Sequence, residues 1–262
     1  MTTGLKMLTF ALMLSAVTLS SCAARDTSFL SRSLQTETGT FKYRVYLPTG
    51  WSSDRKWPVI LYLHGAGERG DDNMQQIDVG LGPAIKQHPD RFPFVVVFPQ
   101  CPSDYWWSQP EMEEVATKAL DSATKEFNGD TRRTYLTGIS MGGYGAWDLA
   151  EKNPGKFAAL APVCGGIVPP PYLRSLFTSP PVDESGDPYL TAARRIGKTP
   201  VWIFHGGSDP TVPVSESRQM NAALKAIGGE VKYTEYPGVG HNSWDEAYAE
   251  PDLPVWLLSK SL

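Results

Sequence analysis

The sequence predicts an α/β fold with a mainly parallel central sheet and helices on both faces. Short apolar runs, which are typical of buried strands, alternate along the chain with longer segments of helical periodicity. Residues 58–63 and 94–98 are continuous apolar runs of the kind that central parallel strands show. Residues 111–127 instead place Met, Val, Ala, Leu and Phe side chains on one helical stripe. With 262 residues, 41% of them hydrophobic, the chain is long enough for one domain with a sizeable core.

The remaining elements continue this alternation. Residues 40–47 alternate apolar and partly polar side chains, which predicts a half-buried strand. The turn sequence Asn128-Gly129-Asp130 ends the helix expected at 111–127. Beyond it we expect strands at 134–137, 157–161, 201–204 and 231–236, and helices at 142–151, 214–227 and 255–260. The sequence contains no internal repeat and no linker, so we expect a single domain over residues 38–262.

The N-terminal residues have the pattern of a secretory signal. Lys6 gives a positive start, residues 7–19 are apolar, and small residues precede Cys22. The apolar stretch is shorter than a membrane-spanning helix requires. The run Leu19-Ser20-Ser21-Cys22 resembles the bacterial lipobox, whose cysteine carries a lipid after cleavage. The alternative is an ordinary signal peptide, cleaved near Ala24, which would remove Cys22.

These features predict a lipoprotein-type signal peptide over residues 1–21 and a Ser- and Thr-rich tether over residues 22–37. The mature protein is then extracytoplasmic, either periplasmic or at the cell surface, and a lipid on Cys22 attaches it to the membrane. The net charge is −4 and the sequence has no basic cluster. We therefore expect no nucleic-acid partner.

The segment Gly138-Ile139-Ser140-Met141-Gly142 matches G-x-S-x-G, the pattern of a nucleophile elbow. In such an elbow, a serine on a sharp strand-to-helix turn projects its hydroxyl from the edge of the sheet. The glycines are needed because the strand and the helix pack closely around the turn. The strand expected at 134–137 and the helix expected at 142–151 flank the motif as required. We therefore expect Ser140 to be a nucleophile rather than part of a structural glycine-rich turn.

A serine hydroxyl needs a base to take its proton, and this base is expected among the four histidines of the chain. His64 follows a buried strand, and His88 lies in a polar stretch. His205 ends a strand, where we expect a packed or hydrogen-bonded ring. His241 follows the last strand, and it alone completes the chain order serine, acid, histidine. His241 is therefore the expected base.

The acid is expected in the turn that follows the strand at 201–204. Asp209 lies there, within Gly206-Gly207-Ser208-Asp209-Pro210. An aspartate in this place accepts a hydrogen bond from the histidine, fixes its tautomer and stabilises the imidazolium. The alternative for Asp209 is a turn or helix-capping role. We favour a catalytic triad of Ser140, His241 and Asp209.

Acyl transfer also needs backbone N–H groups that stabilise the developing oxyanion. One donor is expected at Met141, directly after Ser140. The second is expected in the glycine-rich loop that follows the strand at 58–63, at Ala66, with Gly67 as the alternative. Glycines in this loop allow the backbone to approach a substrate carbonyl closely.

Four blocks of the sequence, 64–73, 138–147, 205–213 and 238–244, together resemble α/β-hydrolase esterases. The likeness covers residues 38–262 and is closest to the group of predicted peptidases and phospholipase/carboxylesterases. Dienelactone hydrolases, feruloyl and acetylxylan esterases and prolyl-oligopeptidase catalytic domains are more distant in their resemblance. The resemblance implies an α/β-hydrolase fold with the triad and oxyanion residues given above. Dienelactone hydrolases, however, have a cysteine nucleophile where this chain has Ser140.

Two features leave alternatives open. Cys101 and Cys164 each follow an expected strand, so they either form a disulfide in an oxidising compartment or remain small buried residues. Residues 165–189 form a long Pro-rich segment between two expected strands, longer than is usual for the esterase group. Its position permits either a lid over the active site or a surface excursion.

Three tryptophans are weaker site candidates. Trp106 and Trp107 lie on a loop after an expected strand, and Trp244 follows His241. We expect them to line the acyl or alcohol pocket, with ordinary packing as the alternative. The sequence has no residue cluster with metal-ligand spacing and no phosphate-binding glycine loop, so we expect neither a metal nor a cofactor.

The sequence thus predicts a serine carboxylesterase that hydrolyses a small-molecule or polymer-borne ester through an acyl-enzyme. One alternative is a polysaccharide- or polyester-directed esterase of the feruloyl or acetylxylan type, and another is a serine peptidase. A third is a binding protein that keeps the fold without catalysis. The sequence leaves the natural substrate and the oligomeric state open.

Overall fold

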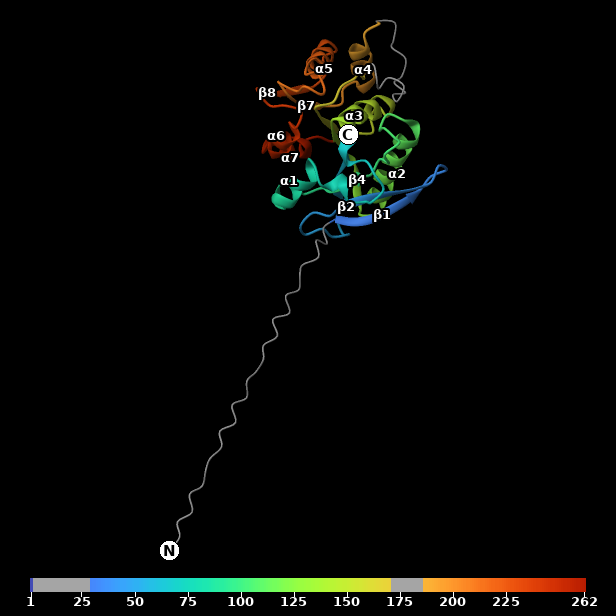
Figure 1. Cartoon of the computed structure of the whole chain (residues 1–262), viewed down its shortest axis with the longest axis vertical. Helices are drawn as coiled ribbons and strands as arrows, with labels where there is room; N and C mark the ends of the chain where they lie inside the picture. Colours follow the sequence, from blue (N-terminus) through green and yellow to red (C-terminus); the bar gives the residue numbers. More distant parts are fainter. Residues whose placement is uncertain (2–28, 171–185) are drawn as a thin grey trace.

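The computed structural model of the chain describes Met1, residues 29–170 and residues 186–262 (Figure 1). The expected signal peptide, Cys22 and the first part of the expected tether lie outside the described residues. Residues 171–185, the middle of the expected lid, lie outside them as well.

The described residues form one eight-stranded sheet with the strand order β1-β2-β4-β3-β5-β6-β7-β8. Strand β2 pairs antiparallel with β1 and with β4, whereas every other neighbouring pair is parallel. The predicted mainly parallel sheet is therefore confirmed. The strands are β1 (Phe29–Gln35), β2 (Thr40–Tyr46), β3 (Trp57–Leu63), β4 (Val95–Pro99), β5 (Gly129–Ile139), β6 (Ala159–Val163), β7 (Val201–Gly206) and β8 (Val231–Tyr236).

Helices cover both faces of the sheet, as predicted (Figure 1). Helices α2, α3, α4 and α5 bury their apolar stripes on one face, and α1, α6 and α7 bury theirs on the other. Short 3₁₀ turns η1, η2 and η3 occur in the loops before β4. The bounds are η1 (Ala66–Glu68), η2 (Gln75–Ile77), α1 (Leu81–Gln87), η3 (Pro89–Arg91), α2 (Pro110–Glu126), α3 (Met141–Lys152), α4 (Pro188–Ile196), α5 (Ser215–Ala226), α6 (Trp244–Ala249) and α7 (Asp252–Leu258).

The expected tether is too long by one strand. Residues 29–35, which we expected to be part of it, form β1 and pair with β2 along their whole length. Phe29 and Leu34 are the buried side chains of this edge strand. Its remaining positions are polar or partly exposed, so the sequence lacks the regular alternation that predicts a strand. The folded domain therefore includes residues that precede position 38.

Both ends of the expected lid are held by the domain. After β6, the backbone N–H groups of Ile167 and Val168 donate to the carboxylate of Glu216 at 2.9 and 3.0 Å. At the other end, helix α4 begins at Pro188, inside the expected lid, and its N-cap Asp187 accepts from the N–H of Tyr189. The segment between β6 and α4 therefore ends at Asp187, and the last two residues of the expected lid belong to α4.

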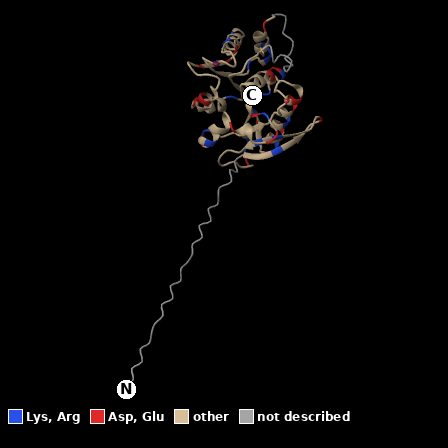
Figure 2. Cartoon of the chain, viewed as in Figure 1, with Lys and Arg blue, Asp and Glu red and all other residues tan. Residues whose placement is uncertain are grey.

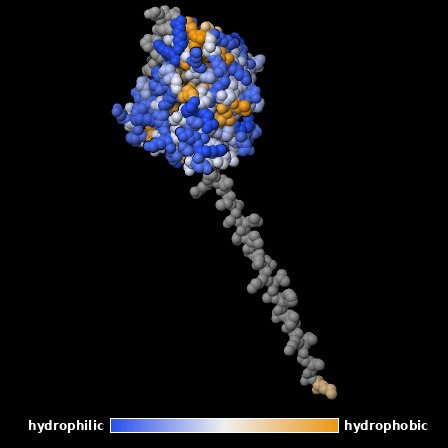
Figure 3. Space-filling model, turned by 180° about the vertical axis from the view of Figure 1, so that it is seen from behind, coloured by the Kyte–Doolittle hydropathy of each residue, from blue (hydrophilic) through white to orange (hydrophobic). Residues whose placement is uncertain are grey.

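The surface is mixed in charge. Acidic and basic residues are interspersed over the drawn elements rather than separated by sign (Figure 2). On the face that Figure 3 shows, hydrophobic residues form small groups between hydrophilic ones. Within residues 29–170 and 186–262, no helix has both the length and the apolar character that crossing a membrane demands.

Candidate active site

The expected nucleophile lies at the junction of β5 and α3. Ser140 has φ 51° and ψ −116°, which is an unusual backbone conformation for a residue other than glycine. The two motif glycines make this turn sterically possible. A Cβ atom added at Gly138 would lie 2.3 Å from the carbonyl oxygen of Gly142, and one added at Gly142 would lie 1.9 Å from that of Leu63. The strand-to-helix elbow therefore requires glycine at both positions, as the motif predicts.

The three expected triad residues meet at the carboxyl end of the parallel strands. Ser140 follows β5, Asp209 follows β7 and His241 follows β8. The Oγ atom of Ser140 lies 2.8 Å from Nε2 of His241, and Nδ1 of His241 lies 2.7 Å from Oδ2 of Asp209. Oxygen acceptors on Asp209 place the proton on Nδ1, so Nε2 is free to accept the serine proton. This arrangement is the one that base-assisted attack by serine requires.

The triad residues differ in their exposure to solvent. The side chain of His241 is 21% exposed, whereas that of Asp209 is fully buried. Burial alone raises the pKa of Asp209, but side-chain hydrogen bonds from His205 and His241 outweigh it. The backbone N–H groups of Thr211 and Val212 add two more, at 2.8 and 2.9 Å from Oδ1. Together these donors hold the pKa of Asp209 well below its usual range, so the carboxylate is ionised.

The expected oxyanion loop follows β3 and lies against the elbow. A Cβ atom added at Gly65 would lie 3.7 Å from Cβ of Ser140. Nδ1 of His64 lies 2.7 Å from the carbonyl oxygen of Gly65, and Nε2 accepts from the N–H of Cys101 at 3.0 Å. Nδ1 therefore carries the proton and donates it to Gly65. Because the carbonyl and the following N–H point in opposite directions across a trans peptide unit, this bond fixes the direction of the Ala66 N–H.

Met141, the other expected oxyanion donor, is the first residue of α3. The N–H groups of the first helical turn have no partner within their helix. The positive end of the helix dipole also lies there, so a negative charge is stabilised next to Ser140. Ala66 and Met141 thus both belong to segments that adjoin the nucleophile, as the sequence predicts.

Arg69 braces the oxyanion loop through bonds to backbone carbonyl oxygens. Its Nε donates to the carbonyl oxygen of Ala66 at 3.0 Å, and its Nη1 donates to that of Ser103 at 2.9 Å. The guanidinium also lies 5.3 Å from the ring centre of Trp106. Arg69 therefore joins the loop after β3 to the loop after β4, which carries Trp106.

The three expected substrate-binding tryptophans have different surroundings. Trp107 is buried, and its indole N–H donates to the carbonyl oxygen of His64 at 2.9 Å. It therefore packs beneath the oxyanion loop and offers no open wall to a substrate. Trp106 is partly exposed beside Arg69. Trp244 is also partly exposed, and its ring stands edge-on to that of His241 at 5.5 Å between centroids.

Trp244 also lines a cavity of about 300 Å³ between α1 and α6. The cavity wall includes Gly80 and His88 on one side and Asp245 on the other. A flat aromatic ring next to polar side chains is a suitable surface for a sugar or aromatic group. Trp106 and Trp244 therefore remain the candidates for substrate contact, whereas the structure assigns Trp107 to packing.

The two remaining cysteines are buried free thiols and are not bridged to each other. Burial raises the pKa of both, that of Cys101 to about 12. Cys164, Asp209 and His241 each place one ligand-type atom within 4.8 Å of the others. Asp209 and His241, however, already hydrogen-bond to each other with these groups. The geometry therefore favours a triad over a metal centre at this place.

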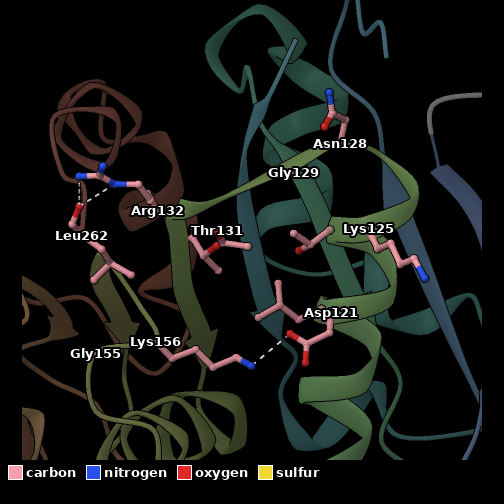
Figure 4. Close-up of a pocket in the computed structure, with 12 residues that line it drawn as sticks. Asp121, Lys125, Asn128, Gly129, Thr131, Arg132, Gly155, Lys156 and Leu262 are labelled. Atoms are coloured by element: carbon pink, nitrogen blue, oxygen red, sulfur yellow. Dashed lines mark hydrogen bonds and ion pairs between the residues drawn. The ribbon is translucent and has the colours of Figure 1, made fainter. Parts of the chain in front are cut away.

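A larger cavity of about 710 Å³ lies at the amino end of β5, away from the carboxyl ends of the strands (Figure 4). Its wall contains the C-terminal Leu262, which accepts from Arg132, and the ion pair of Lys156 with Asp121. None of the triad or oxyanion residues lines it. The cavity is therefore separate from the candidate active site.

The fold and the geometry of serine, histidine and aspartate define an α/β hydrolase. Residues 33–250 match the model of the esterase family that is described as "Putative esterase", and the chain belongs to this family. The predicted resemblance to α/β-hydrolase esterases is therefore confirmed.

Similar proteins include esterases of several kinds. The solved structure "Crystal Structure of a Thermostable Esterase" is 32% identical with a TM-score of 0.75, covering 90% of this chain and 64% of that one. A bifunctional acetylxylan esterase/xylanase of Neocallimastix patriciarum is 32% identical over 124 residues, which are 46% of this chain and 17% of the relative. Poly(3-hydroxyalkanoate) depolymerase C of Paucimonas lemoignei is 26% identical over 231 residues, which are 78% of this chain and 50% of the relative. The chain thus spans half or less of these two relatives.

Proposed function

We propose that this protein is a serine carboxylesterase that hydrolyses carboxylic esters through an acyl-enzyme. The observation that carries the proposal is the hydrogen-bonded series Ser140–His241–Asp209, with distances of 2.8 and 2.7 Å, in a chain of the esterase family. The loop of Ala66 and the start of α3 at Met141 add the backbone donors that acyl transfer needs. No step of this chemistry calls for a cofactor.

The mechanism has two steps with the same groups. His241 takes the proton of Ser140, whose Oγ attacks the ester carbonyl, and the N–H groups of Ala66 and Met141 stabilise the oxyanion. The alcohol leaves with the proton held by His241. A water molecule, deprotonated by His241, then attacks the acyl-enzyme and releases the acid. Asp209 stays ionised throughout and stabilises the imidazolium.

The proposal is tested with a series of p-nitrophenyl esters from acetyl to long acyl chains. We expect hydrolysis by the purified protein and a loss of roughly 10⁴-fold or more in kcat for Ser140→Ala. The dependence of kcat/KM on chain length then measures the acyl pocket. Equal inactivity of both proteins on every ester would count against a simple carboxylesterase and favour a peptidase, a polymer-directed esterase or a binding protein.

For the substrate, we favour an ester carried by a polymer. The relatives named for acetylxylan and for poly(3-hydroxyalkanoate) support this choice, as do the partly exposed rings of Trp106 and Trp244 next to the loops of the site. Release of acetate from acetylated xylan and of hydroxy acids from a polyester, each measured against p-nitrophenyl acetate, tests the two polymer classes.

A serine peptidase is the second candidate, because the same triad cleaves amides. Peptide p-nitroanilides distinguish the two functions, since an esterase leaves them intact under conditions in which it hydrolyses the matching esters. Preference for the anilide in kcat/KM would support the peptidase.

We propose that the protein acts outside the cytoplasm and is held on a membrane by a lipid on Cys22. The support is the apolar run at 7–19 followed by Leu19-Ser20-Ser21-Cys22. Expression in a bacterial host with labelled palmitate should label the protein and place it in the membrane fraction. Cys22→Ala should lose both the label and the membrane association, whereas Cys101→Ala, the control at a buried thiol, should keep both.

A further inference from the structure

A second histidine contacts the carboxylate of Asp209. Nε2 of His205 lies 3.3 Å from Oδ2 of Asp209, the same oxygen that accepts from Nδ1 of His241. His205 is the next-to-last residue of β7 and has no exposed surface. The Asp209 carboxylate therefore lies between two imidazole rings, one partly exposed and one completely buried.

The partners of His205 fix the position of its proton. Nε2 also lies 3.0 Å from the carbonyl oxygen of Val212. A backbone carbonyl and a carboxylate can only accept, so Nε2 carries a hydrogen and faces both acceptors. Nδ1 lies 2.7 Å from Oγ of Ser217, a buried hydroxyl of α5. In the neutral ring, this hydroxyl donates to Nδ1 and holds the ring in place.

We propose that His205 is a positioning residue, which holds Oδ2 of Asp209 in line with His241 through its Nε2–H and is itself held by Ser217. This inference rests on the proposed function, because it assigns His205 a part in the same reaction. The series of contacting side chains is then Ser217, His205, Asp209, His241 and Ser140. His205 contacts no reacting atom and acts only through Asp209.

The donors to Asp209 are divided between its two carboxylate oxygens. The backbone N–H groups of Thr211 and Val212 donate to Oδ1 only, so this turn provides no donor to Oδ2. Oδ2, the atom that faces His241, is held on the protein side by His205. A hydrogen bond to a buried charged group is among the stronger ones in proteins.

The same bond also sets how strongly Asp209 attracts the proton on His241. Each donor to Oδ2 withdraws negative charge, so removing His205 leaves a more basic carboxylate and a more stable imidazolium at His241. Further titratable groups adjoin His205 and Asp209. Glu235, the pairing partner of His205 on β8, is bound to Arg218 and to Tyr233, and Cys164 lies near Asp209 as a buried thiol.

The test compares His205→Phe, which fills the space without a donor, with His205→Gln, whose amide restores a donor near the position of Nε2. For p-nitrophenyl acetate, we expect His205→Phe to lower kcat by roughly 10- to 100-fold, equivalent to losing one hydrogen bond to a charged group, with KM changed by less than about 2-fold. The acidic limb of kcat/KM against pH should move to higher pH, since His241 binds its proton more tightly. His205→Gln should recover most of kcat, and its acidic limb should return to the wild-type pH.

Trp202→Phe is the matched control. Trp202 lies on the same strand, is buried, and donates to Oγ1 of Thr234 at 3.0 Å, so its replacement also removes a partly buried hydrogen bond. It should leave both kcat and the acidic limb unchanged. A loss of packing alone lowers the folded fraction, which near-ultraviolet circular dichroism detects, but it does not move the limb.

Ser217→Ala keeps the proposal testable where His205→Phe does not fold. It removes only the partner of Nδ1, and we expect about a 2- to 10-fold lower kcat at unchanged KM. If His205→Phe folds and keeps the wild-type kcat and acidic limb, the proposal is overturned. If His205→Phe does not fold, the same result in Ser217→Ala overturns it. An equal loss in His205→Gln and His205→Phe with an unmoved limb would do so as well. Wild-type activity in Ser140→Ala would instead overturn the esterase function itself.

Discussion

Two His-Gly pairs, His64-Gly65 and His205-Gly206, stand at the carboxyl ends of buried strands on opposite sides of Ser140. Both rings are completely buried, yet they have opposite tautomers. His64 meets a backbone N–H at Nε2 and a carbonyl oxygen at Nδ1, so its proton is on Nδ1. His205 meets two acceptors at Nε2 and a hydroxyl at Nδ1, so its proton is on Nε2. The His-Gly sequence places each ring at the end of a strand, and the hydrogen-bond partners determine which ring nitrogen carries the proton.

The glycines of the two pairs face different atoms. A Cβ atom at Gly206 would lie 2.1 Å from the carbonyl oxygen of Gly240, in the loop that carries His241. A Cβ atom at Gly65 would lie 2.9 Å from the carboxylate of Glu68, within the oxyanion loop. Gly206 thus lets the loop that carries His241 close over the end of β7, whereas the flexible Glu68 side chain could move away from a Cβ atom at Gly65. The loop after β3 presents amides to the oxyanion, and the loop after β7 presents a carboxylate to the base.

The largest expected effect on kcat comes from removing the charge of Asp209, on the His205 side of Ser140. Asp209→Asn keeps the shape but removes the ionised group and places an amide against two histidine donors. We expect kcat to fall by roughly 10⁴-fold, because the imidazolium loses its counter-charge and His241 its tautomer. The measurement is kcat for p-nitrophenyl acetate. A loss below about tenfold would mean that Asp209 is only a turn residue, as its bonds to Thr211 and Val212 alone would allow.

Removing the ring of His64, next to the oxyanion loop, should lower kcat less and should not change the pH dependence. His64→Leu frees the carbonyl of Gly65, so the Ala66 N–H loses its fixed direction. We expect a 10²- to 10³-fold lower kcat, comparable to the loss of one oxyanion donor. The acidic limb of kcat/KM should stay in place, because no group of His64 contacts the Asp209–His241 pair.

The matched variant for His64 sharpens the contrast with His205. His64→Asn returns a donor near the position of Nδ1, so it should recover much of kcat, whereas His64→Gln should not. At position 205 we expect the opposite, with Gln recovering more of kcat than Asn, because Nε2 is the donor of His205. Equal recovery by Asn and Gln at position 64 would show that the ring only fills space.

The sequence predicted most of what the backbone alone determines. The elbow motif fixed Ser140, and the chain order of serine, acid and histidine selected Asp209 and His241, since each follows a parallel strand at the same edge of the sheet. The long apolar runs of β3 and β4 and the stripe of α2 likewise predicted their elements to within two residues. These signals are local or periodic, so one sequence is enough to read them.

What the sequence could not predict depends on contacts between distant segments. The burial of Trp107 under His64, the brace of Arg69 between two loops and the contact of His205 with Asp209 have no local pattern. Strand β1 was missed because an edge strand buries few of its side chains.

The buried ring of His64 also predicts a dependence of stability on pH. Burial lowers the pKa of His64 to about 4, from about 6.5 in the unfolded chain, so the unfolded state binds the extra proton. The free energy of unfolding should therefore be unaffected above pH 6.5 and should fall as the pH drops from 6.5 toward 4. Between pH 7 and pH 5 this group should account for about 2 kcal/mol. Urea unfolding at the two pH values measures it, and His64→Asn should lack this part of the decrease.

The smallest expected effect concerns the support beneath the oxyanion loop. Trp107→Phe keeps the ring but removes the hydrogen bond to the carbonyl of His64, so the loop is held less firmly. We expect kcat to fall about 2- to 10-fold with KM unchanged, because Trp107 is buried and contacts no substrate. Trp106→Ala, one residue earlier, should instead raise KM for a bulky ester, since this ring is partly exposed. If Trp107→Phe raised KM and left kcat unchanged, the assignment of Trp107 to packing would be wrong, and the ring would have to reach the substrate when it binds.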